Sequence, residues 1–125
     1  MRESRFPRLA GWAVALGLFA SALPAVAAPH VYSAKEAKDH VGEFASVRGV
    51  VERAHVSHSG MEFLDFDGAY PNAPFTAVVF AADASAVGDL SDLEGKRVTV
   101  TGKIAEYKGK PEIVVRRRDE LKTDR

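Results

Sequence analysis

Two long stretches of the chain alternate between apolar and polar residues. The first, Phe44–Val56, places alanine, valine and glycine on one face and serine, arginine, valine and glutamate on the other. The second, Lys96–Tyr107, alternates valine, glycine and isoleucine with arginine, threonine and lysine. A period of two with one apolar face predicts a half-buried strand over each stretch. Gly49 and Gly102 fall in the middle of these strands, where glycine is typical of a bulge or of a bend at a barrel corner.

Shorter apolar runs predict three further strands, which are Met61–Asp67, Phe75–Ala81 and Glu112–Arg116. In the first of these, alternation places Leu64 and Phe66 on one face, which we assign to the core. Phe63 and Asp65 then lie on the opposite face. The second run is apolar on both faces, so alternation does not orient it. Four of the seven phenylalanines lie between Phe63 and Phe80, so this region is either core or a platform for a flat ligand.

Glycine, proline, asparagine and serine predict the loops between these strands, which are His55–Gly60, Gly68–Pro74 and Lys108–Pro111. Helix signals occur in four short segments, which are Ser33–Val41, Asp83–Asp89, Ser91–Gly95 and Arg118–Leu121. Ser33 and Glu36 have the spacing of a capping box, in which each side chain accepts a hydrogen bond from the other residue's backbone N–H.

The N-terminal residues have the pattern of an export signal. Three arginines precede the apolar run Leu9–Leu23, and Ala25-Val26-Ala27 forms a small-residue cleavage motif. We expect a signal peptide at residues 1–27, cleaved after Ala27, and a domain at 28–125 with its core at about 33–122. The protein is then exported, and is periplasmic or secreted. The alternative is an uncleaved N-terminal anchor, although the run is short for a membrane span of roughly 20 residues.

Composition limits how this domain is stabilised and what it binds. The chain contains no cysteine, so no disulfide stabilises the domain and its core must do so. Residues 28–125 carry 14 basic and 16 acidic side chains, a net charge of −2 with histidines neutral. Nucleic-acid-binding proteins are usually basic, so such a ligand requires a local basic patch here.

The order of the predicted elements indicates the fold class. Five short strands, with helical turns between the third and the fourth, are the order of an OB-fold, a small five-stranded Greek-key barrel. The two long strands each carry a glycine where a barrel strand curls. A β-sandwich has a similar pattern and is the alternative.

Two segments resemble a known family. FLDFDGAYPNAPFTAVVF and LEGKRVTVTGKIAEYKGKPEIVV are similar to segments of small exported bacterial OB-fold domains described as nucleic-acid-binding-like. The resemblance extends over roughly residues 33–122. It implies a mainly β fold, a five-stranded barrel with short helices. Its implication for function is weaker, because a shared fold does not establish a shared activity.

OB-folds bind oligonucleotides or oligosaccharides across their second and third strands, between two connecting loops. Those loops are His55–Gly60 and Tyr107–Pro111 here. Single strands are held by aromatic stacking and a basic groove. The candidate ligand-binding residues are therefore Arg48, Phe63, Tyr70, Lys103, Tyr107, Lys108 and Lys110. The alternative is structural, with Phe63 packed under the Tyr70 loop, Tyr107 closing the barrel end and the lysines as ordinary turn residues.

Other candidate chemistry has less support from the residues. Arg116–Arg118 is the one basic run in the predicted domain, and the acidic residues after it indicate a solvated edge. His55 and His58 are potential metal ligands, but no recognised spacing supplies a third ligand. Asp65 and Asp67 with Arg48 suggest a nuclease, but no nuclease pattern matches.

We therefore expect a non-catalytic exported binding module without a cofactor or a metal. The expected ligand is single-stranded nucleic acid or another extended polymer. The alternatives are a protein-interaction or structural module of the cell envelope, with an envelope protein as partner, and a module that binds a small ligand or a cation.

Overall fold

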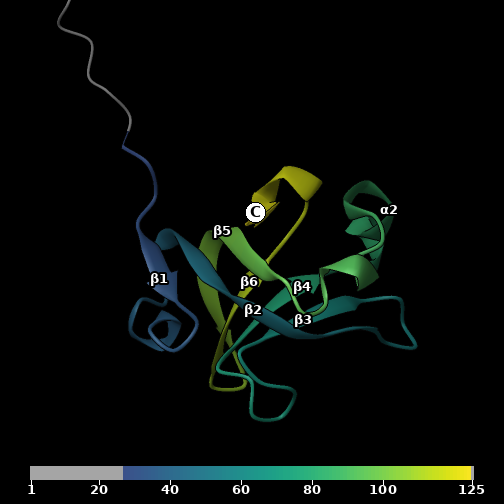
Figure 1. The fold of residues 1–125 in the computed structure, drawn as a ribbon, viewed down its shortest axis with the longest axis horizontal. Coiled ribbons are helices and arrows are strands. Elements are labelled where there is room, and N and C mark those ends of the chain that lie inside the picture. The colour runs from purple at the N-terminus through teal and green to yellow at the C-terminus, as the bar shows by residue number, and fades with distance from the viewer. Residues whose placement is uncertain (1–26, 125) are drawn as a thin grey trace, which may run out of the picture.

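The computed structural model describes residues 27–124, which fold into a small β-barrel (Figure 1). Its strands are β1 (Val31–Ser33), β2 (Phe44–Val56), β3 (Glu62–Phe66), β4 (Phe75–Val79), β5 (Arg97–Tyr107), β6 (Lys110–Val114) and β7 (Leu121–Thr123). Its helical segments are η2 (Ala37–Asp39), η3 (Ala81–Asp83), α2 (Ala84–Val87), η4 (Ser91–Leu93) and η5 (Arg118–Glu120). The predicted signal peptide, apart from Ala27, lies outside the described residues.

Five strands close the barrel in the order β2-β3-β4-β6-β5, and β5 pairs back onto β2. Every pair in this ring is antiparallel except β4 with β6, which is parallel. A closed five-stranded ring of this kind, mainly β with short helices, is the predicted OB-fold. The strands β1 and β7 extend the ring at its outside, pairing with β2 and β5. The sequence pattern did not predict them, because three residues are too few to show alternation.

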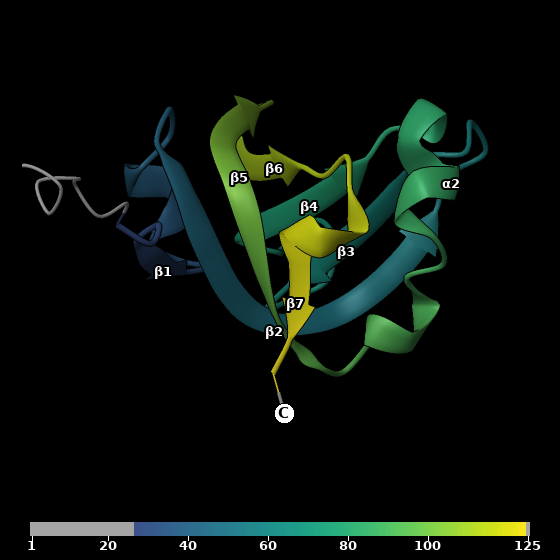
Figure 2. The same cartoon turned by 90° about the horizontal axis from the view of Figure 1, so that it is seen from above.

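The long strand β2 belongs to both halves of the barrel. Its residues Phe44–Val50 pair with β5, and Val51–Val56 pair with β3. The register shifts between Val51 and Arg53, so a bulge separates the two halves. Bulges bend the strand that carries them, and Figure 2 shows β2 curving from one side of the barrel to the other.

Gly49 lies two residues before this bulge, close to the bulge or bend that its position in the sequence predicted. A Cβ atom at position 49 would lie 3.1 Å from both carboxylate oxygens of Asp67. The Asp67 carboxylate also accepts a hydrogen bond of 2.9 Å from the N–H of Val50. Glycine at position 49 therefore lets the end of β3 approach β2 closely.

The core lies inside the ring and confirms the predicted inward face of β3. Leu64 and Phe66 are fully buried, and Phe66 packs edge-to-face on Phe75 with ring centroids 5.3 Å apart. The pairing of β3 with β4 also orients β4, which alternation did not orient. Phe75, Ala77 and Val79 point inward, so Thr76 and Val78 lie on the outer face.

The helical turns are shorter than predicted. The capping box is present, with the Ser33 N–H donating to Glu36 at 2.8 Å and the Glu36 N–H donating to the Ser33 hydroxyl at 3.2 Å. It precedes a single 3₁₀ turn, however, and no helix continues to Val41. The helical segment that follows β4, made of η3 and α2, lies beside β3 and β4 (Figures 1 and 2). None of the helices in the described part of the chain has the length and apolar character needed to cross a lipid bilayer.

Candidate functional site

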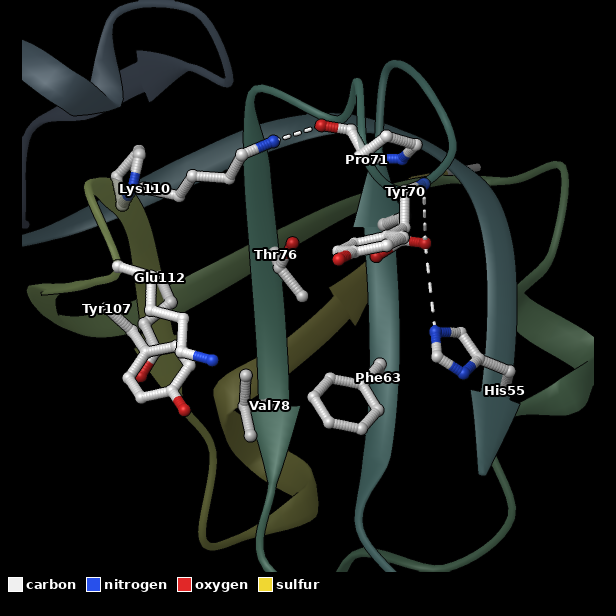
Figure 3. Close-up of a pocket in the computed structure, with 12 residues that line it drawn as sticks. His55, Phe63, Tyr70, Pro71, Thr76, Val78, Tyr107, Lys110 and Glu112 are labelled. Carbon is white, nitrogen blue, oxygen red and sulfur yellow. Dashed lines mark hydrogen bonds and ion pairs between the residues drawn. The ribbon is translucent and has the colours of Figure 1, made fainter. Parts of the chain in front are cut away.

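A groove with a volume of about 430 Å³ lies on the outer face of the barrel. We call this surface the groove, and its lining residues are His55, Phe63, Asp65, Tyr70, Pro71, Thr76, Val78, Tyr107, Lys108, Lys110, Pro111 and Glu112. In Figure 3 the groove runs over Thr76 and Val78, with His55 and Phe63 on one side and Tyr107 and Glu112 on the other. It therefore spans β3, β4 and β6, together with the ends of β2 and β5.

Strand pairing places two rings together on one side of the groove. His55 lies directly opposite Phe63 in the β2–β3 pair, and their rings are stacked with centroids 5.0 Å apart and planes tilted by 16°. Residues directly opposite in a pair project to the same face, which accounts for the contact. Phe63 is only partly buried, so its remaining ring surface faces the groove.

Two tyrosines complete the aromatic lining, and both are largely exposed. Tyr107 ends β5 and exposes 61% of its surface, and Tyr70 in the β3–β4 loop exposes 71%. Figure 3 shows the Tyr70 ring above Phe63, with the Tyr107 ring across the groove from them. Exposed rings on two sides of a groove are suited to stacking on a flat ligand.

The loop that carries Tyr70 is held at two points. Asp65 is only 2% exposed although it lies on the outer face, and its carboxylate accepts a hydrogen bond of 3.2 Å from the Tyr70 N–H. The Nε2 atom of His55 lies 3.8 Å from the same carboxylate. The ammonium of Lys110 donates to the backbone carbonyl of Pro71 (Figure 3). These contacts fix the Tyr70 loop to β3 and to β6.

The two lysines of the groove belong to a tight hairpin between β5 and β6. Lys108 and Gly109 both have positive φ, at 51° and 79°, which is typical of a two-residue type I′ turn. This turn places Tyr107 opposite Lys110, so β6 begins at Lys110, earlier than the predicted Glu112. The Nζ atom of Lys108 lies 5.4 Å from the centre of the Tyr107 ring, within cation–π range.

Glu112 is a partly buried carboxyl group inside the groove. Burial raises the pKa of the Glu112 carboxyl above its usual value of 4.5. The same side chain lines a second hollow of about 260 Å³, which extends the groove toward Met61 and Phe80. Glu112 therefore lies where the two hollows join.

Five of the seven predicted ligand-binding residues line the groove, namely Phe63, Tyr70, Tyr107, Lys108 and Lys110. Arg48 and Lys103 do not. Arg48 donates to the Thr99 hydroxyl and lies 3.7 Å from Asp124, and Lys103 lies opposite Phe44. Both residues do point outward, but they belong to the β2–β5 side of the ring, and the groove lies on the β3–β4–β6 side.

Several lining residues were not singled out as ligand contacts from the sequence. Thr76 and Val78 were missed because β4 is apolar on both faces, and Glu112 because the predicted strand began there. His55 and Asp65 were considered only for metal or nuclease chemistry. The signal for His55 was its alternation with inward-facing Ala54, which places it on the outer face with Phe63.

Potential metal ligands do not gather in the part of the chain that the structure describes. No group of three or more histidine, cysteine, aspartate or glutamate side chains there is placed to hold a metal ion. His55 contacts Phe63 and Asp65, and His58 is exposed in the following loop.

The basic run Arg116–Arg118 lies outside the groove and has structural contacts. Arg118 donates to the backbone carbonyls of Val87 and Asp89, at 3.2 and 3.0 Å. Arg117 forms an ion pair of 3.1 Å with Asp119. The contacts of Arg118 connect the C-terminal segment to the end of α2 and to the residues after it.

Comparisons with known proteins support the fold. In sequence, no family model and no curated protein matches the chain. In structure, the chain is similar to a protein from Leishmania major Friedlin described as an aspartyl-tRNA synthetase, with a TM-score of 0.53 and 12% identity. The match covers 90% of this chain and 26% of that protein, so the chain spans about a quarter of its length. At this identity the similarity shows a shared barrel fold alone.

Proposed function

We propose that this chain is a non-catalytic binding module whose groove takes up single-stranded nucleic acid. The observation that carries the proposal is the grouping of four rings and two lysines around one groove on the outer face of β3 and β4. OB-folds bind extended polymers on this face. Stacking on aromatic side chains contributes about 1–3 kcal/mol per base and tolerates any sequence.

The arrangement of charge suits a single strand bound with modest affinity. Lys108 and Lys110 line the groove from the β5–β6 hairpin, where they can contact phosphates, and the rings line the same groove, where bases can stack. Residues 28–125 have a net charge of −2, so long-range attraction to a polyanion is weak. Stacking must then supply a large part of the affinity. The structural neighbour is named for transfer RNA, which agrees with this ligand class but does not carry the proposal.

The residues that suggested a nuclease each have a different structural partner, which supports a non-catalytic role. Asp65 accepts from the Tyr70 N–H and Asp67 from the Val50 N–H. Arg48 is directed to Thr99 and Asp124. These contacts hold loops and strand ends, and they do not direct the three side chains to one reacting atom.

Export remains part of the proposal and rests on the N-terminal sequence pattern. Cleavage after Ala27 gives a protein that begins at Ala28. Mass spectrometry of the protein from a periplasmic or culture fraction tests this. A chain that keeps residues 1–27 would contradict cleavage after Ala27.

Fluorescence anisotropy with a labelled single-stranded oligonucleotide of about 12 nucleotides, in the range of OB-fold site sizes, tests the ligand. We expect binding at low salt that weakens between about 50 and 200 mM salt. Tyr107→Ala should lower the affinity by about 1–3 kcal/mol. Phe44→Ala is the matched control, because Phe44 is also an exposed ring at 64% but lies outside the groove.

The absence of binding at low salt would refute the nucleic-acid proposal. An equal loss from Tyr107→Ala and Phe44→Ala would place binding elsewhere on the surface. If nothing binds at low salt, an envelope protein partner becomes the leading alternative.

A further inference from the structure

The carboxyl group of Glu112 occupies a position in the groove that its structural role does not explain. Glu112 lies on the outer face of β6, directly across from Thr76 in the parallel β4–β6 pair. Tyr107 and Val78 lie close to it in Figure 3, and it lines both the groove and the adjoining hollow. A partly buried carboxyl group in such an aromatic setting gains from a hydrogen-bond partner.

The described part of the chain does not supply that partner. No hydrogen bond or ion pair to the Glu112 carboxyl occurs among residues 27–124, and burial is the one cause that raises its pKa. The nearest lysine in sequence, Lys110, donates one of its three N–H groups to the Pro71 carbonyl and none to Glu112. The partly exposed carboxyl oxygens of Glu112 are therefore able to accept hydrogen bonds from a molecule bound in the groove.

The polar groups that lie beside Glu112 in the sheet limit which ligand can bind there. Thr76 lies between Asp65 and Glu112 in the register of β3, β4 and β6. Asp65 is buried and already accepts from the Tyr70 N–H. Of the two partly exposed groups in this row, the Thr76 hydroxyl can donate or accept a hydrogen bond, whereas the ionised Glu112 carboxyl can only accept.

We propose that Glu112 makes the groove select bases that carry an exocyclic amino group, and cytosine in preference to uracil or thymine. This inference rests on the proposed nucleic-acid function and adds the specificity of the same site. A carboxylate accepts a hydrogen bond from the cytosine N4 amino group, whereas uracil presents a carbonyl oxygen at that position. The carboxylate repels that oxygen.

The lysines orient a nucleotide consistently with this choice. Lys110 and Glu112 lie two residues apart on the same face of β6, about 7 Å along the strand. A phosphate bound by Lys110 and a base edge bound by Glu112 can thus belong to one nucleotide. The ring of that base then lies over Val78, between Phe63 and Tyr107.

Oligonucleotides of equal length made only of cytidine or only of uridine test the inference, because the two bases differ chiefly in this amino group. Anisotropy titrations of the protein near neutral pH measure both affinities. We expect cytidine to bind about five-fold or more tightly, the discrimination typical of a well-formed base contact. In Glu112→Gln this ratio should fall toward one, because the amide can donate to the uracil oxygen as well as accept.

Glu106→Gln is the matched control. Glu106 is exposed on the same hairpin, opposite Pro111, and is not part of the groove lining. Both variants remove one negative charge, so both strengthen phosphate attraction, but only Glu112→Gln should change the ratio of the two affinities.

Four results would overturn the inference. Equal binding of the two oligonucleotides, or a cytidine preference that persists in Glu112→Gln, removes the specificity role and leaves the proposed function standing. A preference lost equally in Glu106→Gln shows an effect of net charge. If neither oligonucleotide binds, the proposed function fails together with the inference.

Discussion

The branched methyl group of Ile113 occupies the space in which a side chain at position 102 would begin. A Cβ atom on Gly102 would lie 2.7 Å from the Cγ2 atom of Ile113. Gly102 is on β5 and Ile113 is on the neighbouring strand β6, and both are buried. The absence of a side chain at position 102 therefore lets β6 pack closely against β5.

Gly102→Ala should lower the free energy of unfolding by about 1–3 kcal/mol, because it overpacks a tight core. Ile113→Leu removes the Cγ2 methyl group while keeping the side-chain volume. The double variant should therefore recover part of the loss, with a coupling above about 0.5 kcal/mol. Chemical denaturation of all four proteins measures this coupling. Strict additivity would mean that Ile113 is not the group that excludes a side chain at position 102.

Asp65→Ala should release the Tyr70 loop as well as lower stability. The buried carboxylate accepts from the Tyr70 N–H, and removal of such an acceptor costs about 1–3 kcal/mol. Asp65→Asn keeps an acceptor oxygen and is the control. Hydrogen exchange of the Tyr70 amide should accelerate in the alanine variant more than in the asparagine variant. Unchanged exchange in Asp65→Ala would show that other contacts hold the loop.

Glu112 should make the stability of the barrel depend on pH. Burial raises the pKa of its carboxyl above 4.5, so the folded protein favours the protonated form. The stability linked to that proton is complete below about pH 4.5 and is lost as the pH rises through the raised pKa. Glu112→Gln stays neutral, so its melting temperature should exceed that of the unsubstituted protein near neutral pH and approach it in acid.

The control for this pH effect is Glu106→Gln, whose carboxyl is exposed. Its melting temperature should follow that of the unsubstituted protein across the same pH range. A constant difference between Glu112→Gln and the unsubstituted protein at every pH would rule out titration of Glu112 as the cause.

Lys108 and Lys103 should differ in their effect on nucleic-acid binding, although both are exposed lysines of β5 or its turn. Lys108 lines the groove, whereas Lys103 lies opposite Phe44 on the β2–β5 side. Lys108→Ala should weaken oligonucleotide binding and reduce the slope of log affinity against log salt by about one. Lys103→Ala should leave the slope unchanged. A reduced slope in both variants would indicate a phosphate path that wraps around the barrel.

Much of the fold was predictable because its strands carry local signals. Alternation located β2 and β5, and Gly49 marked the neighbourhood of the bulge in β2. The edge strands β1 and β7 were not predictable, because each owes its pairing to a long neighbour and not to its own pattern. The boundary of β6 was misplaced because the turn closes within two residues, and this depends on the positive φ of Lys108.

For the site, the sequence predicted only whether a side chain points inward or outward, because this direction depends on the local alternation of residues. Alternation shows that a residue points outward, and it did so for Phe63, Arg48 and Lys103. It does not show which side of a closed ring that direction faces, because this depends on the curvature of β2 and on its change of partner near Val51. Glu112 became a site residue only through the parallel pairing of β4 with β6.

That parallel pairing also has a kinetic consequence. His55, Phe63 and Thr76 belong to consecutive strands that pair locally, whereas Tyr107 and Glu112 belong to a separate hairpin. The two parts of the groove meet only when distant segments of the chain pair and close the ring, a type of contact that forms slowly. A molecule in the groove bridges both parts and binds only the closed state, so it slows the opening of the barrel and leaves the rate of its formation unchanged.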